Sequence, residues 1–130
     1  MIDREIGQRL ALAQTAWFTS VRLDRSPHTV PVWFVHDEAD LWVASSPSSR
    51  KVANVRLNDQ VSLAIDGSGG EPLVALASAD ILDEVPDHPR VVANFARKYG
   101  GFDITTESYS GPLVLLRLTI TRWLLDGSAQ

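Results

Sequence analysis

The sequence predicts a mainly β fold with short helices, an antiparallel barrel of six strands in one domain over residues 1–130. Two observations favour this fold. Runs of β-branched and aromatic residues follow one another along the chain, separated by short segments of turn residues. Only three segments show helical spacing, and they do not alternate with the strands as helices do in a βαβ fold.

The chain begins with a helix and a hairpin. Apolar residues recur at helical spacing from Ile2 to Ala13, which predicts an amphipathic helix over residues 3–14. The runs AWFTSVRL (16–23) and HTVPVWFVH (28–36) flank the turn DRSP, so they are expected to form the first two strands as a hairpin.

Pro31 distinguishes the second strand. Because proline has no amide hydrogen to donate to a neighbouring strand, this strand is expected at a sheet edge or with a bulge. The last strand is expected to bend near Thr121. The same signals predict the remaining strands at residues 41–46, 61–67, 72–85 and 112–127.

Two further helices interrupt the strands. Residues 49–57 follow a serine-rich turn in which Ser48 or Ser49 can act as the N-cap. Residues 87–100 have Pro89 near the start and end at the Gly100–Gly101 pair, as is typical of helix termini. The segment that follows is expected to be a loop.

Composition excludes several classes of function. The net charge of -4 argues against broad nucleic-acid binding, which requires a basic surface. No apolar run approaches the length of about 18 residues that spans a bilayer, so no membrane association is expected. The chain has no cysteine, and its first residues lack the pattern of a signal peptide; we therefore expect a cytoplasmic protein.

The segment SSPSSRKVANVR predicts an anion site. Unpaired backbone amides and a positive dipole occur at the start of a helix, where phosphate often binds. A capped helix with two solvated bases is the alternative interpretation, and the residues alone favour neither. The hydroxyl and basic side chains that gather at this helix start are Ser45, Ser46, Ser48, Ser49, Arg50 and Lys51.

Other polar and aromatic residues give weaker signals. Trp33 and Phe34 must point to opposite faces, so one of them can line a cavity for a flat cofactor, although core or dimer-interface packing is favoured. The three histidines are too scattered to predict a metal site. Arg97 and Lys98 either stabilise the end of their helix or reach a polyanionic cofactor tail, and the first account is the simpler.

Taken in order, several motifs resemble the pyridoxamine 5′-phosphate oxidase-like split-barrel superfamily. They are PHTVPVWF, SS, SRKVANV, VSL, RKYG and VLLRLTITRW, and together they span essentially the whole chain. The resemblance is greatest to the flavin and deazaflavin oxidoreductases that use coenzyme F-420. No single motif is specific, whereas the ordered set is.

This resemblance implies a split β-barrel, of the kind that binds FMN, which forms a homodimer with two cofactor sites at the interface. The strand from Pro31 to Trp33 would lie along the cofactor ring, Asn54 would support the phosphate-binding helix, and the serines and bases would hold the phosphate. The residues expected to bind the cofactor are Pro31, Val32, Trp33, Ser45, Ser46, Ser49, Arg50, Lys51 and Asn54.

The implied function is an oxidoreductase that uses reduced coenzyme F-420 for hydride transfer to an unsaturated or conjugated small molecule. FMN is the alternative cofactor, and a non-catalytic carrier of deazaflavin or haem is the alternative class. No catalytic residue is assigned: the proton is expected from solvent, His28 or Tyr109. Substrate walls are expected from loop 102–111 and Trp123.

The sequence departs from the family pattern at three positions. Ser78 replaces a glycine of the fifth strand and is expected to narrow the space beside the ring. Asp59 replaces a proline. Ser49 replaces a base, which leaves Arg50 as the only cation adjacent to Lys51.

Overall fold

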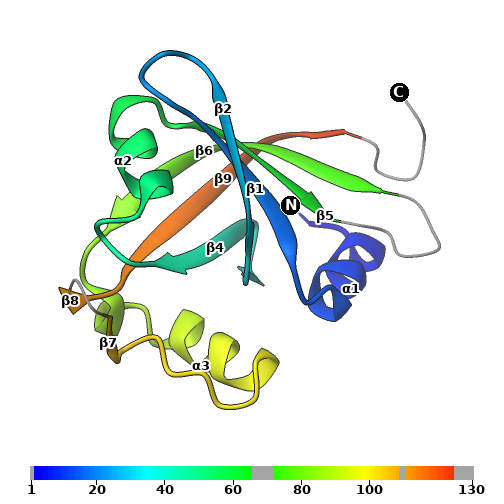
Figure 1. Ribbon diagram of the computed structural model, residues 1–130. Helices are drawn as coiled ribbons and strands as arrows, with labels where there is room; N and C mark the ends of the chain where they lie inside the picture. The colour runs from blue at the N-terminus through cyan, green and yellow to red at the C-terminus, as the bar shows by residue number, and fades with distance from the viewer. Residues whose placement is uncertain (1, 66–71, 109–110, 125–130) are drawn as a thin grey trace.

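The computed structural model describes residues 2–65, 72–108 and 111–124. Strands and three helices account for most of this part of the chain (Figure 1). The strands are β1 (Ala16–Val21), β2 (Pro27–Val32), β3 (Val35–Asp37), β4 (Asp40–Ser45), β5 (Gln60–Ile65), β6 (Leu73–Leu82), β7 (Glu107–Ser108), β8 (Gly111–Pro112) and β9 (Val114–Leu124). The helices are α1 (Arg4–Leu12), α2 (Arg50–Leu57) and α3 (Pro89–Lys98), with a 3₁₀ turn η1 (Val85–Asp87) before α3.

The strands build one curled antiparallel sheet, in the order β2-β1-β5-β6-β9-β4-β3. A separate two-stranded sheet pairs β7, in the segment expected to be a loop, with β8, whose Pro112 was expected to begin the last strand; that strand instead begins at Val114. The fold is therefore mainly β with three helices, as the sequence predicts, and its curled antiparallel sheet is consistent with a split barrel.

The predicted second strand, 28–36, is wrong as a single element. It is broken at Trp33–Phe34: β2 pairs with β1, whereas β3 pairs with β4 at the opposite edge of the sheet. The six predicted strands of the main sheet therefore become seven. We call these two residues the crossover, because they connect the two edge strands; such a short connection requires the sheet to curl until its edges approach each other.

Pro31 lies in an edge strand, which confirms the expectation from its missing amide hydrogen. It is opposite Trp17 of β1, and no strand pairs with the other side of β2 within the described sheet. A bulge lies at Thr121, where the sequence predicts a bend: Leu76 is opposite Arg122, and the next residue of β6 is opposite Ile120.

Each long helix starts at a residue suited to that position. The Asp3 carboxylate accepts a hydrogen bond from the Ile6 amide (2.9 Å) at the start of α1. The Ser49 hydroxyl accepts from the Val52 amide (3.3 Å) at the start of α2, so Ser49 is the cap of the two serines that the sequence offers. α3 is shorter than predicted, because residues 85–87 form the 3₁₀ turn and Pro89 then occupies the first helical position.

The buried side chains form two clusters. The larger one fills the curl of the sheet and includes Phe18, Phe34 and Leu63. The smaller one lies under α3 and includes Trp42 and Phe95. Helix α2 contacts β1 and β6, while α1 and α3 both contact β3, so the helices lie at separate places around the sheet (Figure 1). No helix in the described ranges is long and apolar enough to cross a bilayer.

Candidate functional site

A cavity of about 370 Å³ opens beside the end of β2, and we call it the β2 cavity. Four residues that the sequence predicts for cofactor binding contribute to it: Pro31, Val32, Trp33 and Lys51. Thr15, Ala44 and Phe102 complete its lining. The structure therefore brings the predicted ring-binding strand and the predicted phosphate-binding lysine to one concave site.

The Trp33 indole forms an aromatic wall of this cavity. Its side chain is 48% exposed, while that of Phe34 is fully buried, so the two residues do point to opposite faces. The indole stacks on the Tyr99 ring, with centroids 4.4 Å apart and planes within 5°. Phe102 meets Trp33 edge-on at 5.3 Å. Contacts from outside β2 thus hold the wall in place.

Tyr99 also binds the backbone of the crossover. Its hydroxyl accepts a hydrogen bond from the Phe34 amide (2.9 Å) and lies within donating distance of two carbonyls, those of Gln14 (2.8 Å) and Phe34 (2.9 Å). Because Trp33 and Phe34 lie outside both strands, these bonds replace those of a β-ladder. Tyr99 therefore positions the aromatic wall through both its ring and its hydroxyl.

Lys98, next to Tyr99, also binds the crossover. Its ammonium donates to the carbonyls of Leu10 and Phe34, both at 2.9 Å, and lies 3.8 Å from the centroid of the Phe34 ring. Lys98 does not line the β2 cavity. Beyond its place in the last turn of α3, it connects that helix to α1 and to the crossover.

The serines before α2 shape the loop rather than the cavity wall. Ser45 is buried, and its hydroxyl is 2.9 Å from that of Ser49, which caps the helix. The hydroxyls of Ser46 and Ser48 are 3.3 Å apart. None of these four residues lines the β2 cavity. Their bonds define the path of the chain into α2, whose first amides lack acceptors within the helix.

Lys51 is the basic residue of α2 that lines the cavity. It is half-buried, burial lowers the pKa of its ammonium, and it makes no hydrogen bond or ion pair with any residue that the structure describes. Arg50 is exposed and does not line the cavity. An unpaired, partly desolvated cation at a helix N-terminus favours a bound anion.

More positive charge surrounds Lys51 than the sequence suggests. The pKa of His28, on β2, is lowered first by burial and then by the charges of Arg22, Lys51 and Arg50. These three cations therefore lie within electrostatic range of one imidazole. His28 Nδ1 is buried and has no hydrogen-bond partner in the described structure. Arg22 therefore adds positive charge to the region around His28, while the lowered pKa of His28 favours its neutral form.

Asn54 faces the sheet instead of the cavity. Its side chain is buried, and its amide donates to the Ser20 hydroxyl of β1 at 3.0 Å. This bond fixes α2 against β1 and so fixes the direction of the helix start. The contact fits a supporting role for Asn54 but gives no direct contribution to the cavity.

Two departures from the family pattern contact each other. The Ser78 hydroxyl donates to the Asp59 carboxylate at 3.1 Å, and the Ala79 amide donates to the Asp59 carbonyl at 2.8 Å. Ser78 does not line the β2 cavity, so its expected narrowing of the ring space is not seen there. The pair instead connects the start of β5 to β6.

Some lining residues have no motif of their own. Phe102 belongs to the segment 102–111 that the sequence assigns to substrate walls, and it lines the β2 cavity. Thr15 and Ala44 carry no chemical signal.

Trp123 lines a different cavity, next to Asp40 and Arg122. Tyr109, the other proposed proton donor, lies outside the described residues.

Comparison with known proteins gives one family. A family model described as pyridoxamine 5′-phosphate oxidase matches residues 2–125 of the chain. None of the curated protein sequences is significantly similar to it.

Similar solved structures share the fold at low sequence identity. An F-420 reductase is 17% identical, with 92% of this chain and 95% of that chain covered at a TM-score of 0.75. The haem storage protein from Vibrio cholerae is 18% identical, with coverage of 98% and 96% at a TM-score of 0.74. A FAD-binding protein from Mesorhizobium loti is 17% identical, with coverage of 92% and 87% at 0.70.

Proposed function

The chain belongs to the pyridoxamine 5′-phosphate oxidase family, and from this membership we propose that it is an oxidoreductase that binds coenzyme F-420 in the β2 cavity. Lys51 carries the proposal. It is a half-buried cation without a partner in the described structure, and it lines the same cavity as an aromatic wall. A phosphate on a flat conjugated ring satisfies both features.

The residues fit a phosphate at the end of the cavity near α2. Lys51 supplies the charge and the first amides of α2 supply donors. Arg22 and Arg50 add positive charge nearby, since both, like Lys51, lower the pKa of His28. Because Lys51 is already partly desolvated, an anion there gains more attraction than it would at an exposed lysine. The Asn54–Ser20 bond keeps the helix start aimed at the cavity.

The other residues fit a planar ring. Pro31, Val32 and Trp33 present an edge strand and an indole, and Phe102 closes one side. The reduced coenzyme is a hydride donor, so the protein needs to orient it and to exclude water. The stack of Trp33 on Tyr99 makes this wall rigid, which reduces the ordering cost of binding.

A second copy of the chain is the proposed partner. The outer face of the sheet carries an apolar row across four strands, formed by Pro31, Trp17, Ala64 and Val74 in register. Trp17 is 48% exposed, which is unusual for a side chain of this size. Pro31 belongs both to this row and to the cavity lining, so a copy seated on the row would enclose the cavity.

FMN is the alternative cofactor, because it has a similar planar ring and phosphate. The similar solved structures include both a FAD-binding protein and a haem storage protein. Haem requires an axial ligand, and no histidine is among the described residues that line the β2 cavity. This chemistry favours a deazaflavin or flavin over haem at this site.

Titration of the purified protein with oxidised F-420, FMN and haemin tests the cofactor. We expect F-420 to bind most tightly and K51A to weaken it tenfold or more, because a charged hydrogen bond is worth about 1.5–3 kcal/mol. R56A is the matched control, since Arg56 is an exposed base in the last turn of the same helix, and we expect it to bind normally. Unchanged affinity in K51A would show that Lys51 does not bind the cofactor phosphate.

Turnover then separates an enzyme from a carrier. Reduced F-420 is mixed with the protein and with a panel of enones and quinones, and its reoxidation is followed by absorbance. We expect reoxidation that depends on both protein and acceptor. A protein that binds the reduced coenzyme yet leaves it reduced with every acceptor would be a carrier.

A further inference from the structure

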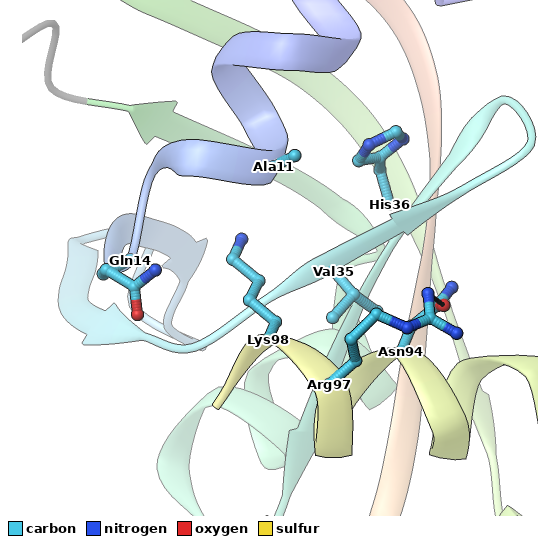
Figure 2. A pocket seen from close by; sticks show the side chains of 7 residues that line it. All are labelled: Ala11, Gln14, Val35, His36, Asn94, Arg97 and Lys98. Atoms are coloured by element: carbon cyan, nitrogen blue, oxygen red, sulfur yellow. Dashed lines mark hydrogen bonds between the residues drawn. The ribbon is translucent and has the colours of Figure 1, made fainter. Parts of the chain in front are cut away.

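We propose that a second cavity, between α1, β3 and α3, binds a small monocarboxylate with an apolar body, independently of the proposed cofactor site (Figure 2). Its volume is about 440 Å³, within the range of small-molecule sites. It shares no lining residue with the β2 cavity. We call it the α3 cavity, and the residues that line it are Ala11, Gln14, Val35, His36, Asn94, Arg97 and Lys98.

The lining is basic and contains no acid. Lys98 and Arg97 extend from α3, and His36 extends from β3 on the opposite side (Figure 2). Neither Lys98 nor Arg97 forms an ion pair with a carboxylate in the described part of the chain. Asp37 is adjacent to His36 along the chain, but it is paired with Arg90 at 2.8 Å. No carboxylate of the described residues therefore neutralises the two cations of the cavity, which favours a bound anion.

Donors remain available after the internal bonds are counted. The Lys98 ammonium has three hydrogens and uses two for the carbonyls of Leu10 and Phe34. Arg97 has five donor hydrogens, and one of its terminal nitrogens bonds the Asn94 side-chain oxygen at 3.1 Å. That bond orients the Asn94 amide so that its nitrogen remains a donor. A carboxylate can accept from Lys98 on one side of the cavity or from Arg97 and Asn94 on the other (Figure 2).

The rest of the lining determines the type of anion. Ala11, Val35 and the aliphatic stem of Lys98 provide apolar surface, which inorganic phosphate would leave uncovered. The pKa of His36 is lowered by burial and by the charge of Lys98, so the imidazole is neutral near pH 7 and adds a hydrogen-bonding group without adding charge. Because two backbone carbonyls already accept from Lys98, the remaining positive charge and the apolar surface match a monoanion with an apolar body better than a dianion.

Benzoate is a suitable probe, and benzamide is its neutral isostere. Ligand-observed NMR with the whole protein measures both affinities. We expect benzoate to bind at least fivefold more tightly than benzamide and more tightly than inorganic phosphate. Equal affinity for benzoate and benzamide would overturn the proposal, because the basic lining would then play no part in binding.

Variants locate the bound benzoate. We expect R97Q to weaken binding at least threefold; Arg97 is exposed, so this variant should fold normally. A11L adds bulk at an exposed position of α1 and should block the cavity without a change in charge. R56Q is the matched control and should bind as the unmodified protein does. Unchanged affinity in both R97Q and A11L would contradict the proposal.

K51M separates this site from the β2 cavity. We expect benzoate binding to be unaffected by K51M, while F-420 binding is lost. If K51M removes benzoate binding, the carboxylate occupies the β2 cavity and the second site does not exist. If K51M leaves F-420 binding intact, the proposed cofactor site fails while the carboxylate site remains.

Discussion

An Arg–Lys pair occurs twice in the chain, as Arg50–Lys51 at the start of α2 and as Arg97–Lys98 at the end of α3. These two lysines are the only ones in the sequence. Both are half-buried, and burial lowers the pKa of each, in Lys98 to about 8. Lys98 nevertheless bonds two backbone carbonyls, whereas Lys51 has no partner in the described structure.

The difference lies in which backbone groups surround each ammonium. Leu10 is in the last turn of α1, where carbonyls lack helical partners, and the Phe34 carbonyl belongs to the crossover outside any ladder. These acceptors satisfy Lys98. The start of α2 exposes amides, which are donors and cannot bond an ammonium. The lysine of this dipeptide therefore has a structural role at the end of α3, where one ammonium hydrogen remains for a ligand, whereas at the start of α2 the whole ammonium is available.

The stability of two matched variants tests this difference between the lysines most directly. We expect K98M to lower the free energy of unfolding by about 1–3 kcal/mol, because two carbonyls lose their donor. K51M should change it by less than about 0.5 kcal/mol, since Lys51 has no bond to lose. Urea unfolding of both variants measures the difference. An equal loss in the two variants would show that their partners do not distinguish the lysines.

Variants of Tyr99 test the structural role of the end of α3 in more detail, because they separate the hydroxyl from the ring. Y99F removes the hydroxyl that bonds Phe34 but keeps the ring against Trp33, so we expect a loss of about 1 kcal/mol with the near-ultraviolet circular dichroism of the stack retained. Y99L should lose both the bond and the signal. If Y99F also abolishes the signal, the hydroxyl rather than the ring determines the position of Trp33.

The pH dependence of cofactor binding gives the smallest effect. Because burial lowers the pKa of Lys51, its charge is lost at a lower pH than that of an ordinary lysine. Affinity for a phosphate-bearing cofactor should therefore be full at neutral pH and fall a few-fold at alkaline pH, beginning below the pH of about 10.4 at which an ordinary lysine titrates. Binding titrations across this range measure it. In K51M the remaining affinity should vary much less, and an equal fall in K51M would assign the effect to another group.

The sequence predicts the fold better than the path of its second strand. Val32 and Phe34 are buried and Trp33 is exposed, but Val35 at the start of β3 is buried as well, so the alternation fails where β3 begins. In the sequence these four residues form one apolar run, VWFV, which contains no turn residue to mark the crossover. The break becomes necessary only when the whole sheet curls, and that depends on pairings between distant strands.

The candidate site was predictable in part for the same reason. Pro31, Trp33 and Lys51 belong to recognisable local motifs, and the structure places them around one cavity. Tyr99 and Phe102 reach Trp33 from far along the chain, through contacts that no local pattern encodes. Asn54 was assigned to the correct helix, but its contact with Ser20 depends on how that helix packs on β1.

The place of β9 in the sheet has a consequence for folding during synthesis. β9 lies between β6 and β4, although it is synthesised after every other strand that the structure describes. Until then β3 and β4 form a hairpin with no connection through a ladder to β2, β1, β5 and β6. The edges of β6 and β4 that will pair with β9 are therefore unpaired during translation. The nascent chain depends on late pairing between distant segments to cover them.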